Sequence, residues 1–265
     1  MRIAIIGSGR LGYHLAKRLN ACHYDVVVVN HRENEVLQRL SSEGIQTEIG
    51  YRQLNTADIV VFCIKDDLIE ELVNKLYSVI KKDAVVVHTS GTIDSVVLKV
   101  FENYGVLYPL YSFTLEEEVQ WHQIPIYYVS CNAYSREVIL SIANSLNERM
   151  VYEIDDEQKR LIHLLAVFSN NFTNTLAHCI YTLSDNNTLK NLDVYNKMIS
   201  FAIQSLMRVR NSNPSHFQTG PAVRGDKKTI QQHLEYLNQY TEITNIYNSF
   251  TAYITNIIKN ERKEK

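Results

Sequence analysis

The chain has 265 residues, of which 45% are hydrophobic, and its formal net charge is −2 at pH 7. This length allows one large domain or two modest ones, and the weak charge gives no reason to expect nucleic acid or an anionic membrane surface as a partner. Its four cysteines are far apart and form no C-x-x-C pair, so we expect a reducing cytoplasm and neither zinc nor disulfides. We also expect no membrane span, because no apolar run approaches ~20 residues, and no signal peptide.

The first twelve residues have the order of a strand, a glycine-rich turn and a helix start. Residues 1–6 are predicted to form a buried strand, followed by Gly7-Ser8-Gly9-Arg10-Leu11-Gly12. Gly7 allows a tight turn, Gly9 lets the backbone approach phosphates, and Gly12 lets the helix pack close to the strand. The N–H groups and dipole of the helix start favour an anion. We interpret the motif as a dinucleotide pyrophosphate site; the alternative is a strand–helix turn without a ligand.

The first half of the chain alternates strands and helices. Further strands are expected at residues 25–30, 45–49, 57–64, 84–88, 105–110, 124–130 and 151–154. Helices are expected at residues 33–44, from a cap at Asp66 or Asp67 to residue 80, and at residues 135–150. Several strands are apolar throughout, as parallel strands covered on both faces are. The pattern predicts an α/β fold in which residues 1–155 form a Rossmann domain with a doubly wound, mostly parallel sheet.

From Asp156 onward we find no strand pattern, so residues 156–265 are predicted to form an all-α domain for substrate binding and dimerisation. Helices are expected at residues 156–184, 192–211 and 226–259. The first connection, around residues 185–187, is short and polar, and Asp226 is placed to cap the third helix. The tail, residues 260–265, is expected to fray.

The end of the second strand distinguishes between dinucleotides. NAD-binding folds carry an Asp or Glu there for the adenosine ribose, but this strand ends in Asn30-His31-Arg32. A carboxylate would repel a 2′-phosphate, whereas the planar guanidinium of Arg32 can bind one. Asn30 suits either ribose. We therefore expect NADP rather than NAD; the alternative for Arg32 is an ordinary exposed arginine. Arg10, inside the turn, lies near the phosphates or faces solvent.

Ligands in such sheets bind beyond the carboxyl ends of the strands, where the strand order reverses. We therefore expect cofactor contacts from Ile64-Lys65 after the fourth strand and from Ser90-Gly91 after the fifth. The second loop should lie near the nicotinamide, with the Ser90 hydroxyl available for catalysis and Gly91 permitting close approach. His88 is either a proton carrier or, in the interpretation we prefer, a half-buried histidine with satisfied hydrogen bonds.

The long helix predicted from residue 156 has one polar stripe. At 100° per residue the stripe contains Lys159, His163, Asn170 and Asn174, and the opposite face contains Leu161, Leu165, Phe168, Phe172, Leu176 and Leu183. We expect such an apolar helix to be largely buried, so that its polar groups need partners or a wet cleft. In a cleft between the domains, they would protonate and orient a carbonyl or imine. The alternative is a polar network inside a helical dimer.

The long connection at residues 211–225 is a further candidate site, because long irregular loops are often functional. Gly220-Pro221 is a stiff turn, and Arg224 could hold a substrate carboxylate bidentately. The alternative is a connection that only leads to the Asp226 cap.

Four local motifs carry a resemblance to known proteins: His88-Thr89-Ser90-Gly91-Thr92, Tyr108-Pro109-Leu110-Tyr111-Ser112-Phe113, Ala166-Val167-Phe168-Ser169-Asn170-Asn171-Phe172 and Gly220-Pro221-Ala222-Val223-Arg224-Gly225-Asp226. With the glycine-rich turn they resemble the 6-phosphogluconate-dehydrogenase-like reductases, which include pyrroline-5-carboxylate and ketopantoate reductases. The chain is similar over nearly its whole length to a bacterial family that pairs a Rossmann-like domain with a helical domain of unknown function (2520), often labelled NADP oxidoreductases. The resemblance implies a homodimer formed through the helical domain.

These observations favour an NADP(H)-dependent oxidoreductase that transfers hydride between nicotinamide and a small carbonyl or imine substrate in the interdomain cleft. Lys159 or His163 would handle the proton, Asn170 and Asn174 would orient the substrate, and Arg224 would anchor an acidic group. A non-catalytic NADP-binding sensor or assembly protein is the alternative. A deazaflavin as hydride partner is a third hypothesis, for which the sequence offers no specific pocket.

Overall fold

The computed structural model describes residues 1–185, 189 and 193–261. The predicted turn at residues 186–187, the predicted helix start at Leu192 and the tail at residues 262–265 lie outside the described residues. The chain forms two compact units, Met1–Asn171 and Phe172–Lys265. The predicted boundary after residue 155 falls earlier than this division, because the helix that begins at Asp156 packs on the sheet of the first unit.

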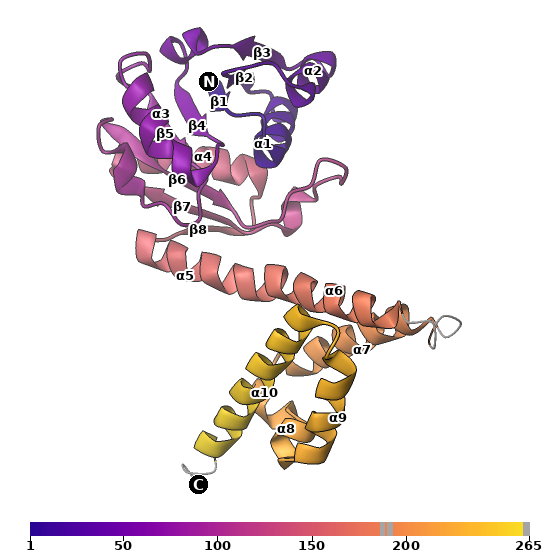
Figure 1. Cartoon of the computed structure of the whole chain (residues 1–265). Helices are drawn as coiled ribbons and strands as arrows, with labels where there is room; N and C mark the ends of the chain where they lie inside the picture. Colours follow the sequence, from indigo (N-terminus) through magenta and orange to yellow (C-terminus); the bar gives the residue numbers. More distant parts are fainter. Residues whose placement is uncertain (186–188, 190–192, 262–265) are drawn as a thin grey trace. The chain divides into compact units, whose positions relative to one another are not determined.

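The first unit is built on one sheet with the strand order β3-β2-β1-β4-β5-β6-β7-β8 (Figure 1). Its strands are β1 (Arg2–Ile6), β2 (Asp25–Asn30), β3 (Gln46–Ile49), β4 (Ile59–Phe62), β5 (Val85–His88), β6 (Asn103–Pro109), β7 (Ile126–Ser130) and β8 (Val151–Glu153). All neighbouring strands are parallel except β6 and β7, which are antiparallel. The predicted α/β fold with a doubly wound, mostly parallel sheet is thereby confirmed.

The strand order reverses between β1 and β4, which lie side by side although two strands separate them in sequence. The carboxyl ends of β1, β2, β4, β5 and β6 meet at one edge of the sheet because these strands are mutually parallel. The segments that follow them, including the glycine-rich turn after β1, therefore share that edge. Rossmann-type sheets bind their ligands there.

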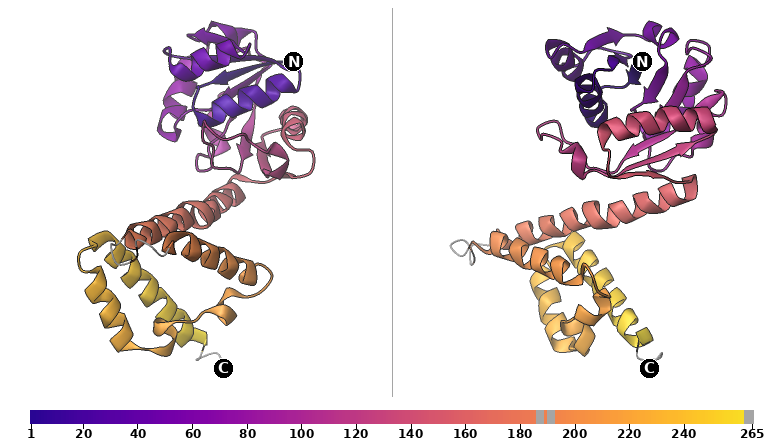
Figure 2. Two further views of the ribbon diagram at one scale, coloured as in Figure 1. Left: turned by 90° about the vertical axis from the view of Figure 1, so that its right-hand side faces the viewer. Right: turned by 180° about the vertical axis from the view of Figure 1, so that it is seen from behind.

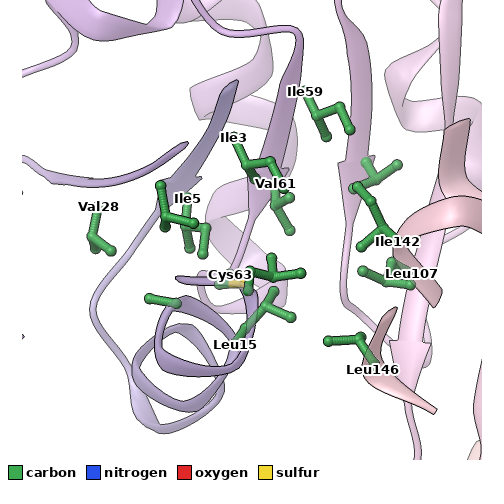
Figure 3. Close-up of a cluster of buried hydrophobic side chains, with 14 of the residues drawn as sticks. Ile3, Ile5, Leu15, Val28, Ile59, Val61, Cys63, Leu107, Ile142 and Leu146 are labelled. Carbon is green, nitrogen blue, oxygen red and sulfur yellow. The ribbon is translucent and has the colours of Figure 1, made fainter. Parts of the chain in front are cut away.

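Helices cover both faces of this sheet. Apolar residues from α1 (Arg10–Ala21), α2 (Glu35–Ser42) and α4 (Ala133–Leu146) pack on one face, and α3 (Ile69–Leu76) packs on the other. In Figure 1, α1 and α2 lie to one side of the strands and α3 to the other, and the rear view in Figure 2 shows α4 crossing the sheet. Figure 3 shows the first core, where Ile5 of β1 and Val61 of β4 approach Leu15 of α1. Strands β1, β2, β4 and β5 are buried on both faces of the sheet, which positions their ends rigidly.

The predicted cap of the helix after β4 is wrong. Neither Asp66 nor Asp67 caps α3 with its side chain; both lie in a short 3-10 turn, Asp66–Leu68. The Asp66 carboxylate instead accepts a hydrogen bond from the Thr92 hydroxyl at 2.5 Å, across to the loop after β5. Because the Asp66 carboxylate is bound to Thr92, it is not available to cap α3.

The last helix of the first unit, α5 (Asp156–Ala166), begins with a capping box in which Asp155 and Gln158 satisfy each other's backbone N–H groups. Ile162 of α5 packs against the buried cluster of Val106, Tyr108 and Val129 on the sheet. The helix continues as a π-helical segment, Val167–Phe172, before α6 (Thr173–Ser184). The predicted uninterrupted α-helix over residues 156–184 is therefore wrong, and a 100° rotation per residue cannot be carried through the wider π turns.

The second unit consists of α6, α7 (Val194–Val209), α8 (Pro221–Arg224), α9 (Lys227–Leu237) and α10 (Thr241–Glu261). Helix α6 packs on α7, while α8, α9 and α10 pack on one another (Figure 1). Asp226 caps α9 by accepting a hydrogen bond from the Thr229 N–H, as predicted. The third predicted helix is divided at residues 238–240, where the Thr244 hydroxyl donates to the carbonyl oxygens of Leu237 and Tyr240.

The second unit has almost no core of its own. Of the residues described from 172 to 257, Leu237 alone is buried. Large apolar side chains are exposed, among them Leu176, Tyr181, Met198, Phe201, Ile203, Leu206, Met207, Phe250 and Tyr253. The apolar side of α5 is exposed in the same way, since Leu161 and Leu165 are each 57% exposed. The predicted burial of this helix face does not occur within one chain.

Candidate functional site: the carboxyl edge of the sheet

The glycine-rich turn after β1 has two glycines that no other residue can replace without rearrangement. Gly7 has a φ of +102°, and a Cβ atom there would lie 2.5 Å from the carbonyl oxygen of Cys63. A Cβ on Gly12 would lie 2.2 Å from the carbonyl oxygen of Gly7. The predicted reasons for both, a tight turn and close packing of the helix on the strand, are confirmed.

Gly9 differs, because apart from its chain neighbours no atom of the described residues lies within 4 Å of the position of its Cβ. It is the N-cap of α1, and no side chain caps this helix end. The first N–H groups of α1 therefore face open space at the positive end of the helix dipole. A side chain at Gly9 would fill the space where a phosphate group could approach the backbone. These features fit the pyrophosphate of a dinucleotide.

The turn is connected to the end of β2 through the buried hydroxyl of Ser8. This oxygen accepts hydrogen bonds from the side-chain amides of Asn30, at 3.0 Å, and Asn34, at 2.8 Å. Asn34 also caps α2 through the Leu37 N–H. Sequence reasoning missed Asn34, although Asn before a helical pattern is itself a capping signal. The cluster holds the phosphate turn and the ribose end of β2 in one arrangement.

The remaining predicted cofactor residues lie near the glycine-rich turn and the ends of β2 and β4. Arg10, His31 and Arg32 are exposed, and Leu11 is half-buried at the start of α1. The amide oxygen of Asn30 accepts a hydrogen bond from the His31 N–H at 2.9 Å. After β4, the Ile64 side chain packs beside Gly7, and Lys65 is exposed. The structure thus brings the two strand ends and the glycine-rich turn together at the edge where the sequence predicted them.

The loop after β5 is ordered by its own polar groups. The Ser90 hydroxyl accepts hydrogen bonds from the N–H groups of Thr92 and Ile93, and the Ser90 N–H donates to Nδ1 of His88. Ser90 is 6% exposed, and its hydroxyl stabilises the conformation of the loop. The predicted catalytic role of this hydroxyl stays a prediction.

His88 is fully rather than half buried, and its Nε2 atom has no partner within the described part of the chain. Burial, together with the charge of Lys159, lowers the pKa of His88 to about 4. The imidazole is therefore neutral at neutral pH. The preferred interpretation, a histidine with satisfied hydrogen bonds, is therefore correct for Nδ1 but not for Nε2.

Lys159 of α5 is completely buried and faces this loop. Its ammonium group donates to the carbonyl oxygens of Ser90 and Ile93 and lies 3.4 Å from the Asp156 carboxylate. Burial lowers the pKa of Lys159, against the opposing effect of Asp156. Because every contact of the ammonium group is with this loop and its own helix, the geometry favours a positioning role over the predicted proton transfer.

His163 lies one turn further along α5 and contacts β6. Its Nδ1 atom is 2.9 Å from the Tyr108 hydroxyl oxygen. A Cβ on Gly91 would lie 2.4 Å from this Nδ1 atom and 3.0 Å from the Tyr108 ring. The close approach that was predicted at Gly91 is therefore made by His163 and Tyr108. The sequence analysis included Tyr108 in a family motif at the end of a predicted strand but assigned it no role in the site.

His163 and Tyr108 line a cavity of about 640 Å3 within the first unit. Ser112 and Asn170 lie at the same cavity, and the Asn170 amide donates to the Ser112 hydroxyl. The other lining residues are Leu110, Tyr111, Ala166, Val167, Ser169 and Asn171. The cavity thus gathers an imidazole, a phenol, a hydroxyl and an amide at the carboxyl end of β6, which can hydrogen-bond a polar ligand.

Two predicted substrate residues belong to the second unit. Asn174 follows the π-helical segment and is exposed. Arg224 ends α8, and its guanidinium lies 4.0 Å from the Asp226 carboxylate while 64% of its side chain is exposed. The proposed roles of Asn174 and Arg224 in substrate binding therefore stay predictions.

Two family models match the chain in tandem. Residues 2–91 match a family described as "NADP oxidoreductase coenzyme F420-dependent", and residues 126–254 match a "Domain of unknown function (DUF2520)". The chain pairs an NADP-oxidoreductase-type domain with a DUF2520 domain. This confirms the family that the sequence motifs indicated. No curated protein sequence matches the chain.

Solved structures agree with this assignment. A Bacteroides fragilis protein described as a "putative NADP oxidoreductase" is 27% identical, covers 96% of this chain and 98% of its own, and has a TM-score of 0.85. The fold is also shared, at 12% identity, by a Plasmodium falciparum pyrroline carboxylate reductase with NADP bound, which covers 97% of this chain and 99% of its own with a TM-score of 0.60. An NAD complex of a semialdehyde dehydrogenase NAD-binding protein from Cupriavidus necator is 16% identical, with 98% coverage of each chain and a TM-score of 0.58.

The family and the Bacteroides relative support an oxidoreductase of the NAD(P)-dependent type. Within the described residues, no helix is long and apolar enough to cross a membrane.

Proposed function

We propose that this protein is an NADP(H)-dependent oxidoreductase acting on a small carbonyl or imine compound. The observation that carries the proposal is the cavity in which His163 and Tyr108 lie against Gly91, beside the Ser112–Asn170 pair. This cavity opens at the carboxyl end of β6, on the sheet edge that also holds the glycine-rich turn. A dinucleotide-binding turn and a polar cavity on one edge are the two parts that a hydride-transferring enzyme needs.

The proposed cofactor is NADP. Its pyrophosphate would lie at the N-terminus of α1 beside Gly9, and Asn30 and Arg32 would contact the adenosine ribose and its 2′-phosphate. The preference over NAD is supported by the amide rather than carboxylate at Asn30 and by the exposed guanidinium of Arg32. When bound, the nicotinamide would supply or accept the hydride.

The residues around the cavity suit distinct roles. His163 would hold and exchange a proton at the substrate oxygen or nitrogen, and Asn170 would orient the substrate through its amide. Lys159 would hold the carbonyl oxygens of Ser90 and Ile93 so that Gly91 lies under the imidazole. Arg224 and Asn174 remain proposed substrate contacts from the helical unit, since a guanidinium suits an acidic group.

The deciding experiment is a fluorescence titration of the full-length protein with NADPH and NADH, followed by an NADPH-consumption screen of aldehydes, ketones, imines and keto acids. We expect tighter binding of NADPH and turnover of at least one compound. Absence of NADPH binding would refute the proposal at its first step. If NADPH binds, His163→Asn should abolish turnover and retain NADPH affinity. A sensor or assembly protein would bind NADPH without turnover of any compound.

We also propose that the protein is a homodimer assembled through its helical unit. A helical unit of this length normally buries a substantial core, yet Leu237 alone is buried among its described residues up to 257. The exposed apolar side chains of α7 include Ile203 and Leu206, which are three residues apart and so share one helix face. Contiguous apolar surfaces of this kind typically mark interfaces between subunits. A second copy of this chain is the occupant that the family resemblance implies.

Sedimentation equilibrium would test this assembly. We expect about twice the chain mass of 30.7 kDa for the wild-type protein. The double variant Ile203→Glu/Leu206→Glu should sediment as a monomer or lose helical content. Val96→Glu changes a similarly exposed apolar residue in the first unit and should leave the dimer intact. A monomeric wild-type protein would refute this assembly.

A further inference from the structure

Tyr108 has a fixed position in the sheet. It pairs with Tyr127 on β7, which pairs with Tyr152 on β8, so three tyrosines lie in register across three strands. The ring centroids of Tyr108 and Tyr127 are 6.5 Å apart, and those of Tyr127 and Tyr152 are 5.6 Å apart. Neighbouring aromatic rings at such distances attract one another and restrict rotation. The Tyr108 hydroxyl is therefore held toward α5.

The direction of the Tyr108–His163 hydrogen bond follows from burial. Tyr108 is 8% exposed, and its hydroxyl contacts one hydrogen-bonding side-chain atom in the described chain, Nδ1 of His163. Burial raises the pKa of Tyr108 to about 12, so the phenol keeps its proton at neutral pH. A buried hydroxyl needs an acceptor, and a neutral imidazole accepts at only one nitrogen.

We infer that Tyr108 is a positioning residue that fixes His163 in the tautomer with the proton on Nε2. Nδ1 is then occupied as an acceptor, and Nε2–H is the imidazole group left for a ligand in the cavity. This inference rests on the proposed function and narrows its substrate: the group that meets His163 must be a hydrogen-bond acceptor. A carbonyl oxygen or an imine nitrogen is such a group, whereas an ammonium group is not.

The charge of the cavity wall narrows the ligand further. The residues of the first unit that line this cavity include no Lys, Arg, Asp or Glu. Its polar groups, among them the amide of Asn170 and the hydroxyl of Ser112, are uncharged. A carboxylate placed in this part of the cavity would lose its hydration without gaining a cation. The reacting part of the substrate is therefore an uncharged carbonyl or imine group.

Imidazole NMR tests the tautomer without a substrate. In full-length protein labelled with 15N-histidine, long-range 1H–15N correlations distinguish protonated from unprotonated ring nitrogens, and His163→Gln identifies the His163 signals by their loss. We expect an unprotonated Nδ1 and a protonated Nε2 in the wild-type protein. Tyr108→Phe should move the Nδ1 signal toward that of free neutral imidazole. Tyr127→Phe removes a neighbouring hydroxyl but keeps the hydroxyl of Tyr108, so it should not move this signal.

Gly91→Ala provides a second variant in case Tyr108→Phe does not fold. Its Cβ would overlap Nδ1 of His163, so it separates the pair while retaining the phenol. We expect it to move the Nδ1 signal as Tyr108→Phe does. A wild-type spectrum with a protonated Nδ1, or a Tyr108→Phe spectrum identical to the wild type, would overturn the inference. Such a result with normal NADPH binding would leave the proposed function standing, whereas a failure of NADPH to bind would remove the function without altering the tautomer.

Discussion

The carboxylate of Asp156 accepts hydrogen bonds from both the N–H and the hydroxyl of Ser95, at 3.0 and 2.6 Å. These bonds join the first turn of α5 to the segment that follows β5. They also hold the carboxylate 3.4 Å from the ammonium group of Lys159, which is completely buried. The contact between Asp156 and Ser95 therefore stabilises both the buried charge of Lys159 and the loop that carries Gly91.

Replacing Asp156 with Asn should lower the free energy of unfolding by about 1–3 kcal/mol, because one amide cannot accept all of these bonds or balance the buried Lys159. Urea denaturation of the full-length protein would measure the change. Glu157→Gln removes an exposed charge from the same helix turn and should change stability by less than about 0.5 kcal/mol. Equal stability of the two variants would contradict this role for Asp156.

The contribution of Asp156 should depend on pH. Burial acts to raise the pKa of Asp156, but the hydrogen bonds from Ser95 and the charge of Lys159 outweigh it and hold the pKa below its usual 3.8. A carboxylate with a lowered folded-state pKa stabilises the protein above its unfolded pKa, and this stability is lost as pH falls through the folded-state pKa. The difference in unfolding free energy between wild type and Asp156→Asn should be constant from about pH 5 to neutrality and shrink in stronger acid. A difference that grows toward low pH would exclude this explanation.

Lys159→Met should reduce NADPH affinity, because it leaves the carbonyl oxygens of Ser90 and Ile93 without their donor and loosens the loop beside Gly91. We expect a loss of about tenfold, equivalent to about 1.4 kcal/mol, in a fluorescence titration. His163→Asn is the comparison, and its NADPH affinity should stay within about twofold of wild type if the imidazole acts only on the substrate. Unchanged NADPH binding by Lys159→Met together with lost turnover would instead make Lys159 the proton carrier.

Two glycines of the same turn should respond differently to substitution by alanine. Gly12→Ala places a Cβ 2.2 Å from the Gly7 carbonyl oxygen and should lower the free energy of unfolding by about 1–3 kcal/mol or more. Gly9→Ala meets no protein atom within 4 Å, so its unfolding free energy should change by less than about 1 kcal/mol while NADPH affinity falls at least about tenfold. Calorimetry and titration on the same samples separate the two effects. Normal NADPH affinity in a folded Gly9→Ala protein would argue against a phosphate at this turn.

Arg32→Ala should weaken NADPH binding by about tenfold or more and leave NADH binding unchanged, because the guanidinium is proposed to contact only the 2′-phosphate. The loss should diminish at high salt, since the side chain is exposed. Arg52→Ala removes another exposed arginine, beyond β3, and serves as the control. A parallel loss of NADPH and NADH affinity would assign Arg32 to the pyrophosphate or to folding.

Much of the sheet could be predicted from the sequence because its signals are local. Continuous apolar runs of strand length indicate parallel strands covered on both faces, and β1, β2, β4 and β5 all follow this pattern. The cap at Asp226 likewise depends on residues within one turn. The predictions that failed depend on distant partners: Asp66 bonds Thr92 instead of capping α3, and the described part of the chain leaves Leu161 and Leu165 exposed.

The sequence by itself determined that a glycine-rich turn follows the first buried strand and that the second strand of the sheet ends without a carboxylate. It also determined that an all-helical segment follows the sheet. These features rest on glycine sterics, residue charge and short-range periodicity. Tertiary structure alone decided how the polar residues of α5 are used. Packing buries Lys159 against the loop after β5 and leaves His163 beside Tyr108 at a cavity, because α5 crosses strands that lie far away in sequence.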